Sequence, residues 1–173
     1  MKKLVIAATV ALMGIVVHAA AVNWSVVNVQ SSPANTVSAG WIVQLYDSSV
    51  TFDYAKAKAG EITAWVNGAT VAAGATFRAN GSTTMDNGTS KSVYAVVYDA
   101  ASIADAKYYI VSDALTLNAN AAGSNVTAAF GNMAATAATN KFQNSSWTAV
   151  PEPTSGLLML LGMAGLALRR RRA

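Results

Sequence analysis

Cysteine is absent from the chain, and the only histidine is His18, close to the N-terminus. The first absence excludes disulfide bonds and thiol nucleophiles, and the two together leave only carboxylates among the usual zinc ligands. A Ser–His–Asp triad would need a histidine in the folded part of the chain. The commonest hydrolytic chemistries are therefore excluded.

Charged residues are also scarce, with 12 Lys and Arg against 8 Asp and Glu in 173 residues. Half of the basic residues lie at the two ends, as Lys2, Lys3 and four consecutive arginines at 169–172. Residues 22–150 contain six basic and seven acidic side chains, which gives a net charge of −1 (6 − 7). This middle part lacks the positive charge that nucleic-acid binding requires, so no nucleic-acid partner is expected.

The N-terminus has the three parts of a secretory signal peptide. Lys2 and Lys3 precede an uncharged apolar run at 4–17, and small residues follow at 19–21. The run is shorter than a usual spanning helix. We expect signal peptidase to remove residues 1–21, with cleavage after Ala19 as an alternative and a retained N-terminal anchor as a second one.

The C-terminus combines a rigid polar tripeptide, a short apolar run and a basic block. An uncharged run at 154–168 that ends in arginines predicts a transmembrane helix with its basic end in the cytoplasm. Its roughly 22 Å are short of the ~30 Å hydrocarbon core, and snorkelling arginines cover part of the difference. A core helix with a basic tail is the alternative. The tripeptide is Pro151, Glu152 and Pro153, and the basic block is Arg169, Arg170, Arg171 and Arg172.

These features, in this order, resemble the PEP-CTERM protein-sorting signal of Gram-negative-type bacteria, over residues 151–173. The resemblance implies that an exosortase, a membrane-embedded enzyme similar to cysteine transpeptidases, recognises Pro151, Glu152 and Pro153 and cuts nearby. It implies that Arg169–Arg172 form the stop-transfer cluster. It also implies transient residence in the inner membrane, followed by delivery to the cell surface or extracellular matrix. It implies nothing about the domain in front, because the signal occurs on unrelated proteins.

Residues 22–150 are predicted to form one small all-β domain, a β-sandwich or jelly roll with a single short helix. Alternating apolar residues separated by turn signals favour this class. Asp53 and Gly60 are expected to cap a helix at 54–59. Residues 62–66 fit either a strand or a helical turn, and residues 140–150 are expected to close the domain through Phe142 and Trp147. The main expected strands are 26–30, 41–46, 93–98, 108–112, 114–118 and 126–130.

Three Asn-Gly pairs, at 67–68, 80–81 and 87–88, are each expected to form a tight hairpin turn, because both residues tolerate positive φ. The aromatic residues allow two interpretations. They fill the core, or they form a platform on which sugar rings stack. Trp24, Trp41, Trp65 and Trp147 and six tyrosines make up this set.

No motif identifies a catalytic, cofactor or metal site. Asp47, Asp99 and Asp113 each follow an expected strand, where turn-forming Asp is ordinary. No Asp-x-Asp or EF-hand spacing indicates calcium. We therefore expect a non-enzymatic structural or interaction protein of the cell envelope or matrix. One alternative is a carbohydrate-binding module for matrix polysaccharide. Another is a glycosidase, which would need two carboxylates within about 10 Å in one cleft.

Overall fold

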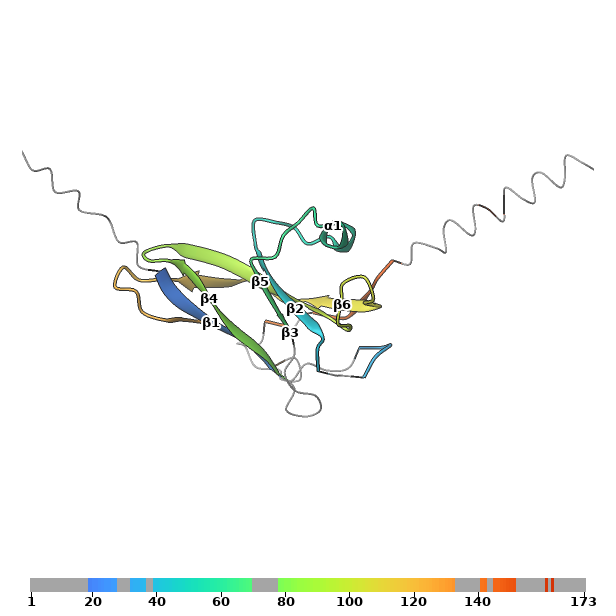
Figure 1. The fold of residues 1–173 in the computed structure, drawn as a ribbon, viewed down its shortest axis with the longest axis horizontal. Coiled ribbons are helices and arrows are strands. Elements are labelled where there is room, and N and C mark those ends of the chain that lie inside the picture. Colours follow the sequence, from blue (N-terminus) through green and yellow to red (C-terminus); the bar gives the residue numbers. More distant parts are fainter. Residues whose placement is uncertain are drawn as a thin grey trace, which may run out of the picture.

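The structure, a computed structural model, describes residues 19–27, 32–36, 39–69, 78–132, 141–142, 145–151, 161 and 163. Up to Pro151 the described residues are all-β apart from one short helix (Figure 1). The elements are β1 (Ala19–Val27), β2 (Ile42–Asp47), α1 (Tyr54–Ala59), β3 (Val66–Ala69), β4 (Arg78–Asp86), β5 (Ser90–Tyr98), β6 (Tyr108–Val111), β7 (Leu115–Asn118), β8 (Val126–Asn132) and β9 (Thr148–Ala149).

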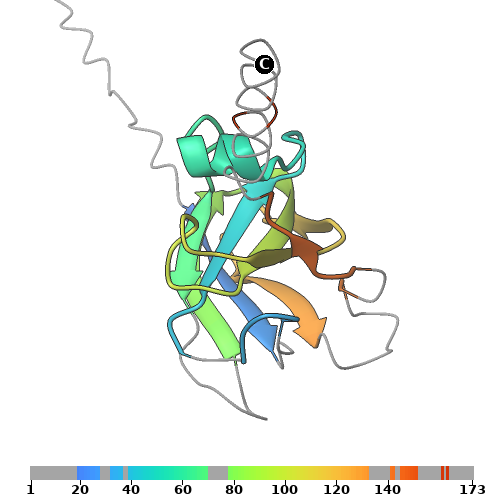
Figure 2. The ribbon, with the colours of Figure 1, turned by 90° about the vertical axis from the view of Figure 1, so that its right-hand side faces the viewer.

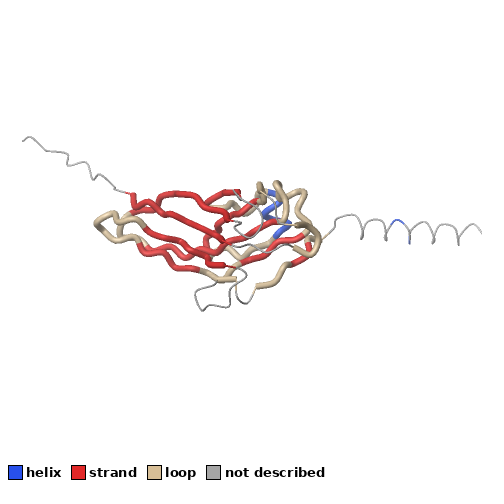
Figure 3. Tube along the Cα trace, turned by 90° about the horizontal axis from the view of Figure 1, so that it is seen from below, coloured by secondary structure: helices blue, strands red, loops and turns tan. Residues whose placement is uncertain are grey.

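The strands form two sheets. One has the order β4-β1-β8, and the other has the order β3-β2-β5-β6-β9, with β7 paired to the first half of β5. β1 and β8 run parallel, whereas the other pairs are antiparallel. Figure 3 shows strands along most of the molecule and the helix at one end.

The main core lies between the inner faces of the two sheets. Period-2 alternation brings Val22, Trp24 and Val26 of β1 to this core, because successive strand residues point to opposite faces. Residues from β2, β5 and β8 meet them, including Leu45 and Phe130, both of which are fully buried. One continuous apolar cluster therefore joins the sheets.

A second cluster covers the other face of the larger sheet, against α1. The helix begins after Asp53, whose side chain accepts a hydrogen bond from Lys56 N at 3.0 Å, and it ends at Gly60 with φ of 76°. The predicted caps are confirmed. Tyr54 brings the helix into this layer. We call its buried members the tyrosine cluster; they are Tyr46, Tyr54, Tyr94, Val96, Tyr98 and Ala106.

Most of the expected strands are confirmed, and their edges shift by a few residues at most. The exception is the start of the first expected strand, at 26–30: β1 covers Ala19–Val27 and so begins seven residues earlier, and residues 28–30 lie outside the described ones. The buried alternation of β1 runs through Val22, Trp24 and Val26, whereas Val27 is only partly buried. Between 62 and 66, no helix forms, and β3 begins at Val66.

Only one of the three Asn-Gly pairs forms the expected turn. Asn87-Gly88 joins β4 to β5, with Gly88 at φ of 71°. The other two expectations are wrong, because Gly68 lies within β3 and Gly81 within β4. A Cβ on Gly68 would lie 2.3 Å from the Trp24 ring, and one on Gly81 would lie 2.8 Å from it. Both glycines therefore make room for this indole instead of allowing a turn.

The two expected targeting segments lie almost entirely outside the described residues. Within the described ones, helices are too short or too polar to qualify as membrane spans. Leu161 and Met163, from the expected membrane helix at 154–168, are helical and 62% and 64% exposed. These two side chains therefore do not belong to either core cluster.

Candidate functional site

The last strand, β9, ends two residues before the expected sorting tripeptide. β9 pairs with β6, with Thr148 opposite Tyr109 and Ala149 opposite Tyr108. Val150 N then donates to the Lys107 carbonyl at 2.8 Å, and the Val150 side chain packs against the tyrosine cluster. Pro151, the next residue, is exposed. The chain is thus held by the domain until one residue before the tripeptide.

Side chains fix the segment that leads into β9. Phe142 is buried in the main core, and Trp147 lies edge-to-face with Trp41, with ring centroids 5.9 Å apart. The Ser145 hydroxyl donates to the Val111 carbonyl. The expectation that Phe142 and Trp147 close the domain is confirmed.

A cleft of about 370 Å³ opens beside Pro151. Its wall comes from four separate parts of the sequence: Ala34, α1, residues 104–108 and residues 149–151. Figure 2 shows α1 and β9 at the same end of the domain. Lys58, Asp105 and Lys107 supply its charged groups. Of the tripeptide, Pro151 alone is described; Glu152, Pro153 and the arginines at 169–172 lie outside the described residues.

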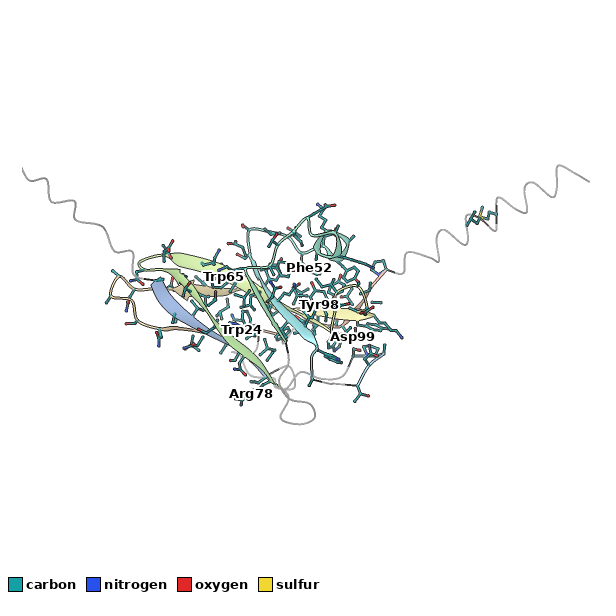
Figure 4. The ribbon with its side chains drawn as sticks, in the orientation of Figure 1. Trp24, Phe52, Trp65, Arg78, Tyr98 and Asp99 are labelled. Carbon is teal, nitrogen blue, oxygen red and sulfur yellow. The ribbon has the colours of Figure 1, made fainter. Side chains whose placement is uncertain are left out.

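A second cleft, of about 460 Å³, lies beside Asp47, at the C-terminal end of β2, and next to the β4–β5 turn. Lys91 Nζ forms an ion pair with Asp47 Oδ2 at 2.5 Å and lies 5.5 Å from the centroid of the Trp65 ring. Thr84, Asp86, Thr89, Ser90 and Ser92 add hydroxyl and carboxylate groups to the wall. Figure 4 shows Trp65 over β5, away from Phe52 and Tyr98. No pattern in the sequence predicts this cleft, because its residues come from four separate segments.

Hydrogen-bond donors hold two carboxylates in place, Asp47 at the second cleft and the buried Asp99. The hydrogen bond from Lys91, and those from the Ser49 N–H and hydroxyl, hold the pKa of Asp47 well below its ordinary value. A general acid needs the opposite shift. Asp99 is 2% exposed and accepts from Ser32 Oγ at 2.6 Å and Asn35 Nδ2 at 2.9 Å.

Asp99 also accepts from two backbone N–H groups, those of Lys107 and Tyr108, both at 2.9 Å. Four donors therefore surround this buried carboxylate, and it ties the loop at 32–35 to the start of β6. Within the part of the chain that the structure describes, no three Asp, Glu, His or Cys side chains gather in a way that could hold a metal ion.

Most of the aromatic residues belong to the two core clusters. Trp24 and Trp41 are almost fully buried in the main core, and four tyrosines form the tyrosine cluster. Trp65 is partly buried and borders the second cleft. The core interpretation therefore holds for most of the set, and Trp65 is the ring that lines the second cleft.

The family model of the PEP-CTERM protein-sorting motif matches residues 149–172. The match covers the tripeptide, the apolar run and the four arginines, so the resemblance seen in the sequence is confirmed. The motif marks the chain as an exported protein that an exosortase-type enzyme sorts. Comparisons with curated proteins and with solved structures returned no match. The matched region starts at Ala149, and it therefore begins inside β9 of the folded domain.

Proposed function

We propose that this chain is a non-enzymatic structural or interaction component of the cell envelope or extracellular matrix, built on one β-sandwich. The observation that carries the proposal is the PEP-CTERM match at 149–172, at the C-terminal end of a cysteine-free β domain. The main core between two sheets supports the sandwich. The proposed site residues are Pro151, Glu152 and Pro153 for recognition, and Arg169, Arg170, Arg171 and Arg172 for stop transfer.

The proposal includes an N-terminal signal peptide and a membrane helix at 154–168. Ala20 is fully buried in the main core and pairs with Met85 of β4. Cleavage after Ala21 would remove this contact, whereas cleavage after Ala19 keeps it. We therefore favour Ala19 as the last residue of the signal peptide, with Ala20 as the first residue of the mature chain.

Intact-mass analysis in two otherwise identical strains, with and without exosortase, tests the proposal. With the enzyme, we expect a surface or extracellular form that begins near Ala20 and lacks the arginine block. Without it, the mass should include residues up to Ala173, and the protein should stay in the inner-membrane fraction. A variant with Arg169–Arg172 replaced by serine should lose retention in the second strain. An unprocessed tail in both strains would contradict the proposal.

The second cleft favours a second candidate function, the binding of a matrix polysaccharide. An indole ring beside hydroxyl and carboxylate groups suits a sugar, which needs both an apolar face and hydrogen-bond partners. The wall has two carboxylates, Asp47 and Asp86, against Lys91, and this charge suits a neutral polysaccharide. Glycan arrays on the exported form test it. Binding that Thr84→Ala and Trp65→Ala weaken would support it, and a flat array would remove it.

A further inference from the structure

The strand β9 is part of the folded domain, and its last residue is also the first residue of the matched sorting motif. The family match starts at Ala149, and Ala149 is paired with Tyr108 of β6. Val150 also gives its backbone N–H to Lys107. The backbone N–H that lies directly before the tripeptide is therefore already used by the fold, and the chain there is held against β6.

An enzyme that acts on a peptide bond generally binds the chain in extended form, through backbone hydrogen bonds and side-chain pockets. A strand cannot give the same N–H and C=O groups to β6 and to an enzyme groove. Three residues, 151–153, separate Val150 from the expected membrane segment, and they span at most about 10 Å when fully extended. A membrane-embedded enzyme that cuts near the tripeptide would therefore contact residues before Pro151.

We propose that β9 is a substrate strand that must leave the edge of β6 before the processing enzyme can act. This inference rests on the proposed sorting function. The strand is suited to release, because it has two residues, both exposed, and lies at the end of its sheet. Short, solvated edge segments open at low free-energy cost. Trp147 packs behind it against Trp41, so the domain stays closed while β9 is out.

Release and return of β9 also protect the product. Cleavage beyond Val150 leaves Thr148–Ala149 on the mature chain, and β9 then returns to β6. An unpaired β6 would be an open sheet edge, and open edges recruit other strands. The same strand thus binds the processing enzyme first and afterwards pairs with the edge of β6.

A disulfide across β9 and β6 tests the proposal, because the natural chain has no cysteine to interfere. The bond from Val150 N to the Lys107 carbonyl makes Tyr108 and Ala149 a non-hydrogen-bonded pair. Cα atoms in such pairs lie about 4.5 Å apart, inside the ~4.4–6.8 Å that disulfides need. The variant is Tyr108→Cys with Ala149→Cys in the full chain, exported to an oxidising compartment.

The matched control is Ser90→Cys with Asn118→Cys, which joins β5 to β7. It is also a non-hydrogen-bonded pair, because Ala119 N donates to the Thr89 carbonyl of the next pair. Pulse-chase labelling measures conversion of precursor to mature form. We expect the β9 lock to slow processing at least tenfold, and a membrane-permeable reductant to restore it. The control disulfide should leave the rate unchanged.

Equal rates for the β9 lock and the control would overturn the proposal. A wild-type chain that is never processed would instead remove the sorting function, so the two failures are distinguishable. Val150→Ala gives an independent readout if the lock prevents folding, since it loosens the contact with the tyrosine cluster. With the enzyme in excess it should be processed severalfold faster than wild type, and an unchanged or slower rate would contradict a required release.

Discussion

The two faces of the larger sheet are both buried, but in different ways. β5 shows the contrast within one strand. Val93, Ala95 and Val97 enter the main core, and Tyr94, Val96 and Tyr98 enter the tyrosine cluster. All six are at most 8% exposed. The main core excludes water between two sheets, whereas the tyrosine cluster is closed by one short helix and loops.

The two layers satisfy polar groups differently. In the tyrosine cluster, hydroxyls find partners: Tyr46 donates to Gln44 Oε1 at 2.5 Å, and Tyr94 donates to the Val50 carbonyl at 2.8 Å. In the main core, Trp24 Nε1 has no hydrogen-bond partner among the described residues. The packing of the main core therefore depends on shape, since Gly68 and Gly81 leave space for the Trp24 ring. The packing of the tyrosine cluster depends also on hydrogen bonds.

The largest expected effect compares the same residue type in the two layers. Phe130→Ala should lower the free energy of unfolding by about 3–5 kcal/mol, because a fully buried ring leaves a cavity. Phe52→Ala should cost clearly less, since Phe52 is partly exposed at the edge of the tyrosine cluster. Urea unfolding of both variants measures the difference. Equal losses would show that the tyrosine layer is as central to stability as the main core.

A substitution at Gly68 tests whether the main core is specified by shape. The added methyl group in Gly68→Ala would collide with the Trp24 ring, so we expect a loss of about 1–3 kcal/mol. Trp24→Phe should cost stability by itself, because a buried ring becomes smaller. If the collision is the cause, adding Gly68→Ala to Trp24→Phe should cost much less than in the wild type. Additive losses in the double variant would reject the close approach as the cause.

Local signals predicted the parts of this fold that local physics decides. Asp53 and Gly60 bound α1 as expected, since a cap depends on a few neighbouring atoms. The strands β2 and β5 also formed close to the expected ranges, since alternation of side chains is a local property of a strand. The alternation could not show that both faces are buried, because that depends on what the helix and the other sheet cover. The Asn-Gly pairs at 67–68 and 80–81 failed for the same reason: Trp24 is distant in sequence.

The candidate sites divide in a similar way. The sorting tail was predictable, because its recognition depends on consecutive residues. The pairing of β9 with β6 was not predictable, since a two-residue strand carries no periodic signal. This pairing holds the chain against the domain directly before the tail. The cleft at Trp65 was also missed, because Asp47 and Lys91 become neighbours only through the pairing of β2 with β5.

A smaller effect should appear at alkaline pH and should come from the tyrosine layer. Burial, with smaller contributions from Tyr46 and Asp47, raises the pKa of Tyr94 to about 12, from about 10 in an unfolded chain. Below about pH 10 both states keep the proton, so stability is unaffected. Between about pH 10 and 12 the unfolded chain ionises first, and stability falls as pH rises.

Tyr94→Phe separates this ionisation from general alkaline damage. The variant loses a hydrogen bond to the Val50 carbonyl and should be about 1 kcal/mol less stable at neutral pH. Its stability should then fall less steeply than that of the wild type between pH 10 and 12. Urea midpoints at half-unit pH intervals measure the slope, and an equal slope in both proteins would show that Tyr94 does not contribute.

The smallest expected effect concerns the ion pair at the rim of the second cleft, outside both layers. Lys91 lowers the pKa of Asp47, so the pair stabilises the fold above the ordinary carboxyl pKa and is lost as pH falls. Both side chains are about a third exposed, at 30% and 37%, so solvent screens them and Asp47→Asn should cost at most about 1 kcal/mol. Urea unfolding at pH 7 in low and high salt measures this cost, which should shrink in salt. A loss that persists in high salt would show that the screened ion pair is not its source. If the cost is as small as expected, Asp47→Asn changes the charge beside Trp65 without unfolding the domain. Any change in polysaccharide binding would then come from the cleft itself.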